Sequence, residues 1–188
     1  MTQTDPNSTP LSDPHLRDTP SSRRRRALES LTRALMRADA GLLARLRRLD
    51  AASPPPAFFR VSVDVLDDLL REKGHWREQD ESRWAVVVQA IAIALGTSPT
   101  SGGLLGNVPF GQALALADVA EMRLLRLLDA EDAQLPDLMR HVIQQMVSKG
   151  QVFAITDLAD LVLARSAQYR EGARRQIARS YYRQHDGN

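Results

Sequence analysis

The sequence predicts an all-α protein, because three of its properties favour helices over strands. Ala, Leu and Arg are abundant, and all three are good helix formers. Aromatic residues, which are enriched in strands, make up only 5% of the chain. Apolar residues recur at helical spacing, and no alternating run of strand length is present. We therefore expect a helical bundle, composed of two small helical halves packed together.

The N-terminal part is expected to be a disordered tail followed by a helical half. Residues 1–22 carry four prolines among Ser, Thr and Asp, and contain too little apolar surface to offset the cost of ordering. The half itself covers residues 23–96. Its first helix is expected from about Ser22, with leucines on one face and arginines on the other. Gly41, with Asp39 as a new N-cap, is expected to divide that helix in two.

Two more helices are predicted in this half. Ser53 followed by Pro54 is expected to start a helix that ends at Gly74. Asp80 is expected to cap the next helix, residues 81–95, which is apolar on most faces and should be the most buried element. Residues 97–109 are predicted to be a loop.

The C-terminal half is expected to cover residues 110–188 and to contain five short helices. Most are predicted from a start or stop signal. Pro109 opens the first helix, and Asp118 with Glu121 forms a capping box for the second, which ends near Asp129. The third covers residues 136–149 and is ended by Gly150, the fourth covers residues 157–164 and is capped by Thr156, and the last carries residues 170–183.

Composition excludes several classes of protein. The 188 residues are 43% hydrophobic and 26% charged, as in ordinary globular proteins. The absence of cysteine excludes disulfides, thiolate metal sites and cysteine nucleophiles. The apolar stretch 86–95 is too short to span a membrane, and the polar N-terminus lacks the apolar core of a signal peptide. We expect a cytoplasmic protein that does not bind a membrane.

No catalytic or metal site is predicted. The stretch GGLLGN, residues 102–107, lacks the Gly-Lys-Ser/Thr that follows in a phosphate-binding loop. The four histidines are isolated from one another, and the acids between Asp64 and Glu72 are typical of a solvated helix face. We therefore expect neither an enzyme nor a cofactor.

Charge is segregated along the chain, although the net charge is only +2. Residues 23–48 hold nine arginines against two acids, and residues 165–183 hold six against one. The intervening residues 64–81 hold seven acids against three basic residues. Arginine makes forked contacts with phosphate. Within the stretch RRQIARSYYR, moreover, Arg175, Arg179 and Arg183 form one row on a helix.

Two interpretations of these arginines remain open on the residues alone. They either bind the phosphates of a polyanion, or pair with the acidic segment 64–81 to stabilise the bundle. The candidate nucleic-acid-binding residues are Arg33, Arg37, Arg45, Arg48, Arg174, Arg175, Arg179 and Arg183. Tyr181 and Tyr182 are candidates for stacking on bases, although one of them is expected in the core.

Five segments, in order and at the right spacing, resemble the small subunit of type I-E CRISPR Cascade, the CasB family. They are ADAGLLARLRRLDAASPPPAFFRV (38–61), LGNVPFGQALALA with Gly106, Gly111 and Leu114, EMRLLRLLDAEDAQLPDLMRHVIQQM (121–146), DLADLVLA (157–164) and ARRQIARSYYR (173–183). Ile177 stands where the family usually has Trp, and Ala164 or Arg165 where another Trp is common.

The resemblance implies an all-α, non-catalytic subunit of an RNA-guided surveillance complex. Its partners would be the backbone and large subunits of Cascade, the CRISPR RNA, the target and displaced DNA strands, and a second copy of the chain. A helical adaptor whose arginine faces bind acidic protein surfaces is the alternative. A free-standing DNA-binding regulator is disfavoured, because no helix-turn-helix pair with a polar recognition helix is found.

Overall fold

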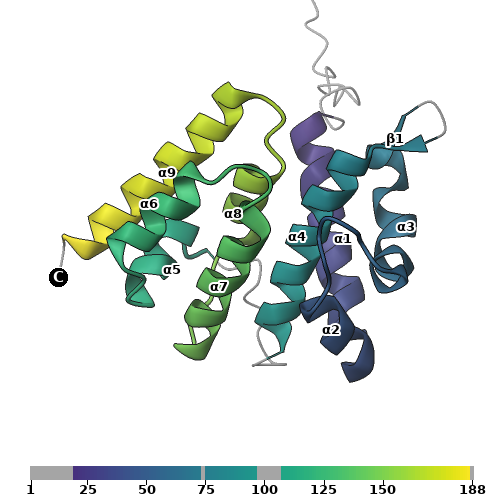
Figure 1. Cartoon of the computed structure of the whole chain (residues 1–188), viewed down its shortest axis with the longest axis horizontal. Coiled ribbons are helices and arrows are strands. Elements are labelled where there is room, and N and C mark those ends of the chain that lie inside the picture. The colour runs from purple at the N-terminus through teal and green to yellow at the C-terminus, as the bar shows by residue number, and fades with distance from the viewer. Residues whose placement is uncertain (1–18, 73–74, 97–106, 187–188) are drawn as a thin grey trace, which may run out of the picture.

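The computed structural model describes residues 19–72, 75–96 and 107–186. Within them the regular secondary structure is helical, except for one hairpin of two-residue strands (Figure 1). The elements are α1 Pro20–Met36, α2 Ala40–Arg47, α3 Pro56–Leu70, β1 Arg71–Glu72, β2 His75–Trp76, α4 Glu78–Leu95, α5 Phe110–Leu116, α6 Glu121–Asp129, α7 Leu135–Ser148, α8 Ile155–Val162 and α9 Ala167–His185. The predicted all-α class is confirmed.

The helices fall into two groups that meet along α4. Figure 1 shows α1 to α4 on one side and α5 to α9 on the other. α4 packs against α1, α2 and α3 within its own group and against α7 and α8 of the second. Twelve of its residues are buried, so the prediction that it would be deeply buried is correct. A single cluster of buried side chains extends through both groups. The predicted bounds of the two halves, residues 23–96 and 110–188, stay a prediction.

The predicted break between α1 and α2 is confirmed. The Asp39 carboxylate accepts a hydrogen bond from the backbone N–H of Leu42 at 2.8 Å, as an N-cap does. α1 begins at Pro20, slightly earlier than predicted, because the Thr19 hydroxyl accepts from the Ser22 N–H and caps it. Residues 20–22 therefore belong to the helix rather than to the predicted tail. The predicted tail up to residue 18 lies outside the described residues, as does most of the predicted loop 97–109.

α3 starts later and ends earlier than predicted. A residue before proline is disfavoured in the helical region, so Pro54 and Pro55 stay outside the helix and Pro56 is its first residue. At the other end the helix stops at Leu70 rather than near Gly74. The chain continues into the β1–β2 hairpin, where Arg71 pairs with Trp76 and Glu72 with His75.

Three predicted caps are wrong, although the helices they were assigned to exist. Asp80 lies inside the first turn of α4, where its carboxylate accepts from Arg165 at 2.7 Å. Asp118 has a φ of 54° and accepts from Lys149 at 3.2 Å, while α6 has no side-chain cap. Thr156 is the second residue of α8, which follows Ala154 without a side-chain cap. Asp80 and Asp118 were wrongly predicted as caps, because their carboxylates accept hydrogen bonds from basic residues that are distant in the sequence.

Candidate nucleic-acid interface

The arginine row on α9 projects from the outer face of that helix. Arg175, Arg179 and Arg183 are all exposed. On the inner face, Ile177 and Tyr181 are each only 1% exposed. The Ser166 hydroxyl caps the helix by accepting from the Tyr169 N–H at 3.3 Å. The predicted arrangement of a basic outer row over an apolar inner face is therefore present.

Close packing against α5 holds α9 in place. At Gly111 the two helices approach so closely that a Cβ would overlap the Ile177 carbonyl oxygen and the Ser180 hydroxyl. The Tyr181 hydroxyl donates to the Val119 carbonyl at 2.6 Å. The arginine row is thus carried by a helix whose orientation is fixed by packing.

The two candidate tyrosines differ in their surroundings. Tyr181 belongs to the core, as expected for one of the pair. The Tyr182 hydroxyl donates to a Glu121 carboxylate oxygen at 2.6 Å, and this bond is the largest cause of the raised pKa of Tyr182. On the same helix Tyr169 is 78% exposed, and it was not predicted as a candidate.

Two of the four candidate arginines on α9 are less available than predicted. Arg175 donates through Nε to Glu171 at 2.8 Å, an i, i+4 pair on the helix surface. One arginine of the row is therefore already paired with a carboxylate of its own helix. Arg174 is half-buried, and its Nε is buried without a hydrogen-bond partner. Arg179 and Arg183 have no hydrogen-bonded carboxylate within the described part of the chain, which leaves them best placed for an external anion.

The candidate arginines of α1 and α2 form a second group, and all four are exposed. Arg33 is held along its own helix, where it donates to the Glu29 carbonyl at 3.3 Å and the Ser30 hydroxyl at 3.2 Å. Arg37 follows the last residue of α1. Arg45 and Arg48 line a groove of about 530 Å³ between α2 and the segment that leads into α3.

Arg60 on α3 joins this second group, although the sequence did not single it out. The pKa of the Asp39 carboxyl is lowered, chiefly by the hydrogen bond from the Leu42 N–H and further by the nearby charges of Arg60 and Arg45. Arg60 is therefore near the start of α2. It lies beyond the basic segment 23–48, so a count of charges along the chain could not include it.

The two groups of arginines lie on helices that stand on different sides of α4. Figure 1 shows α9 along one flank of the molecule and α1, α2 and α3 on the opposite side of α4. The sequence could not show this separation, because it depends on how the two sets of helices pack.

At least one arginine of a basic segment pairs with the acidic segment 64–81. Arg165 pairs with Asp80 at 2.7 Å and so fits the ion-pair interpretation. None of the eight candidate arginines pairs with that segment among the described residues. Elsewhere Arg83 of α4 and Arg170 of α9 both bond to Asp132, in the connection between α6 and α7. Arg83 and Arg170 therefore stabilise the packing of α4 and α9 against the α6–α7 connection.

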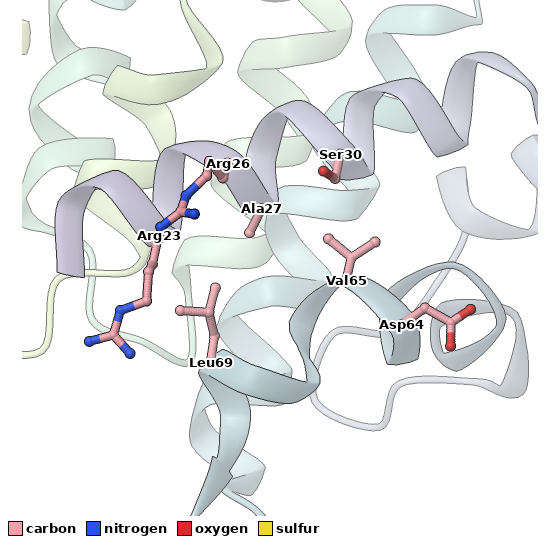
Figure 2. Close-up of a pocket in the computed structure, with 7 residues that line it drawn as sticks. All are labelled: Arg23, Arg26, Ala27, Ser30, Asp64, Val65 and Leu69. Carbon is pink, nitrogen blue, oxygen red and sulfur yellow. The ribbon is translucent and has the colours of Figure 1, made fainter. Parts of the chain in front are cut away.

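A second groove, of about 630 Å³, lies between α1 and α3 (Figure 2). Figure 2 shows Arg23 and Arg26 at one end above Leu69, and Asp64 farther along α3. Both arginines take part in further interactions within the protein. We therefore do not assign this groove as an anion site.

The described residues contain no group of three His, Asp or Glu side chains placed to hold a metal ion. His141 approaches the backbone carbonyl of Asp137 at 2.7 Å, an interaction confined to one turn of α7. None of the described helices is both long and apolar enough to cross a membrane.

Comparison with known proteins assigns the chain to a family. The family model for CRISPR-associated protein Cse2 matches residues 42–182, which is most of the chain. The crystal structure of M. ruber CasB superposes with a TM-score of 0.64 and 23% sequence identity, over 84% of this chain and 93% of that one. No curated protein matches the chain. The chain therefore belongs to the Cse2 family, the small-subunit family of type I-E CRISPR Cascade that its motifs predicted.

Proposed function

We propose that this chain is a non-catalytic small subunit that holds nucleic-acid strands in an RNA-guided surveillance complex through contacts between arginines and phosphates. Membership of the family associates it with other Cascade components. The observation that carries the finer proposal is the row on α9. There, Arg179 and Arg183 stand exposed on successive turns, with no hydrogen-bonded carboxylate in the described part of the chain.

The geometry of this row suits a phosphate backbone rather than a base sequence. Residues four apart on a helix are separated by about 6 Å along its axis, and they project from the same face. A guanidinium makes forked, charge-assisted hydrogen bonds with phosphate oxygens. Contacts of this kind fix the position of a strand without reading its bases, which a complex that reads sequence by base pairing requires.

The separation of the two arginine groups supports contact with more than one strand. The target strand paired with the CRISPR RNA, and the displaced DNA strand, diverge wherever a duplex has been opened. We assign one basic surface to α9 and the other to α1 and α2, without assigning a strand to either. The partners proposed with this role are the backbone and large subunits, the CRISPR RNA, both DNA strands and a second copy of the chain, in the cytoplasm.

One observation favours the alternative role as a protein adaptor. On α6, Met122 is 63% exposed and Leu125 is 40% exposed, and both line a groove of about 690 Å³ that extends to α7. Exposed apolar side chains beside a groove are typical of protein contact. Contact with protein at α6 is compatible with contact with nucleic acid at α9, because the residues concerned are different.

The test is the salt dependence of DNA binding by complexes that contain Arg179→Ala with Arg183→Ala. Each lost phosphate contact should reduce the slope of log K against log salt by about 0.7 for a single strand or about 0.9 for duplex. The double variant should therefore flatten the slope by roughly 1.4 to 1.8 and weaken binding without changing sequence preference.

A matched control removes the same charge elsewhere. Arg126→Ala with Arg140→Ala takes two arginines from α6 and α7, and should leave the slope unchanged if α9 makes the contacts. A melting curve of each variant reports its stability. An unchanged slope together with a lowered melting temperature would show that Arg179 and Arg183 serve the fold or a protein contact instead.

A further inference from the structure

The groove beside α2 combines positive charge with an apolar lining. Arg45 and Arg48 line it at the C-terminal end of α2. Leu49, which is buried, and Pro55 line it from the connection between α2 and α3, and Ala57 lines it from the first turn of α3. Its volume of about 530 Å³ is more than a phosphate ion fills, and lies within the usual range of small-molecule sites, about 300 to 1,000 Å³. A ligand that fits it should therefore carry both an anionic group and an apolar group.

The three neighbouring arginines of this helix separate into two roles. Arg47 points inward, where its Nε donates to the Ala92 carbonyl at 3.0 Å and its guanidinium packs over Gly96. Arg45 and Arg48, three residues apart, share the groove face and are exposed. Within the described residues neither guanidinium is hydrogen-bonded to a carboxylate. Both are therefore available to an anion from outside the chain.

The opposite side of the groove is rigid. Pro54, Pro55 and Pro56 have fixed φ angles, so the segment cannot easily fold into the groove and fill it. The Asp50 carboxylate also lines the groove and is held by the Ala52 N–H at 2.9 Å. Its negative charge repels a phosphate from that part of the groove. A bound phosphate is thereby confined to the arginine side.

We propose that this groove holds one unpaired nucleotide of a nucleic-acid strand, with its phosphate on Arg45 and Arg48 and its base against Leu49, Pro55 and Ala57. The inference rests on the proposed function, since it takes the ligand to be nucleic acid. It adds that the α2 surface is selective for single strands, because a base in a duplex is stacked and paired and cannot enter the groove.

The test compares two single-stranded DNA oligonucleotides of equal length at low salt. One is normal, and the other carries abasic sites at every position, so that it keeps its phosphates but lacks its bases. The full-length protein should bind the normal strand roughly three- to tenfold more tightly, because only that strand buries a base on the apolar lining. The Leu49 methyl resonances should shift with the normal strand and stay in place with the abasic one.

Two variants distinguish the contribution of the apolar lining to DNA binding from that of the two arginines. Ala57→Met fills the groove without changing its charge, and should lower affinity for the normal strand to that of the abasic strand. Ala120→Met makes the same change at an exposed alanine before α6 and should have no effect. Arg45→Ala with Arg48→Ala should flatten the salt slope for both strands by roughly 1.4.

The outcomes distinguish failure of this inference from failure of the proposed function. If the two strands bind equally well, or if the Leu49 methyl groups respond to neither, the groove holds no base and the inference is overturned. The proposed function stands in that case if the arginine variant still flattens the salt slope. If that variant changes nothing for either strand, phosphate binding at this surface fails together with the inference. The methyl measurement uses the unaltered protein, so it decides the question even if Ala57→Met does not fold.

Discussion

Gly111 of α5 lies directly against the backbone carbonyl of Ile177 in α9, with no space for a side chain between them. This contact joins the helix that carries the arginine row to the rest of the C-terminal group. Only glycine allows backbones to approach so closely. The position therefore tests whether the packing that orients α9 is as tight as the structure indicates.

Gly111→Ala should destabilise the protein by about 1 to 3 kcal/mol, because the new methyl group overlaps the Ile177 oxygen and the Ser180 hydroxyl. The loss should occur even though alanine is the better helix former by about 1 kcal/mol. Gly172→Ala on α9 is the matched control. Its added Cβ would meet no atom within 4 Å, so it should stabilise the protein by about 0.5 to 1 kcal/mol. Chemical denaturation measures both, and equal stability of the 111 variant and the wild type would contradict the contact.

The Asp132 cluster, in which Arg83 and Arg170 both donate to Asp132, connects α4 and α9 through one carboxylate. Arg83 is only 12% exposed and Asp132 is 39% exposed. Asp132→Asn should lower stability at neutral pH by about 1 to 2 kcal/mol, a value between that of a surface pair and that of a buried one. The measurement is the melting temperature of the isosteric variant, with Asp137→Asn on the more exposed pair with Arg140 as the control.

The pH dependence of that loss follows from the pKa of Asp132. Partial burial acts to raise this pKa, but the bonds from Arg83 and Arg170 outweigh it and hold the pKa below its ordinary value. A lowered pKa in the folded state contributes stability that is present above the unfolded value of about 3.9 and is lost as pH falls through the folded value. The gap between wild type and Asp132→Asn should therefore close below about pH 4. A gap that stays constant to lower pH would show that the charge of Asp132 does not matter.

Purified protein should hydrolyse neither nucleotides nor nucleic acids when divalent metal ions are supplied. The physical reason is that the described residues contain no cluster of three metal-ligating side chains, and the sequence contains no cysteine nucleophile. The assay follows product release across fractions of a final purification step. Turnover that coincides with the protein, and is abolished by a single substitution, would require a catalytic role.

Local signals predicted helices better than they predicted the partners of charged groups. Asp39 was assigned correctly as a cap because the residue it bonds, Leu42, is only three positions away. Asp80 and Asp118 were misassigned, because Arg165 and Lys149 come from distant segments that the sequence does not place beside them.

In the candidate site, too, features within one helix could be predicted from the sequence and features between distant segments could not. The outward row on α9 could be predicted, because it depends on the period of a single helix. The ion pair between Arg175 and Glu171 could also have been predicted, because the two residues lie four positions apart on that helix. The groove at Arg45 and Arg48 could not be predicted, because it arises where α2 meets the proline segment before α3.

Glu171 is the only acid between Arg165 and Arg183, and its carboxylate accepts from Arg175 at 2.8 Å. Both side chains are largely exposed, at 47% and 68%, so the pair should contribute only about 0 to 1 kcal/mol to stability. Its larger effect should be on binding, because it occupies one cation of the row and places a negative charge beside the others.

Glu171→Gln should therefore tighten the binding of single-stranded DNA by complexes that contain it, while barely changing the melting temperature. If Arg175 then takes up a phosphate, the slope of log K against log salt should steepen by about 0.7. Asp129→Asn removes the same charge from an exposed position on α6 and should leave both quantities unchanged. If Glu171→Gln binds DNA no more tightly than the wild type, the outer face of α9 does not contact phosphate, because a strand lying along the row would respond to a charge within it. If both variants tighten binding to the same extent, only net charge matters. A gain confined to Glu171→Gln is the result expected from the row itself, since only there does the substitution release an arginine.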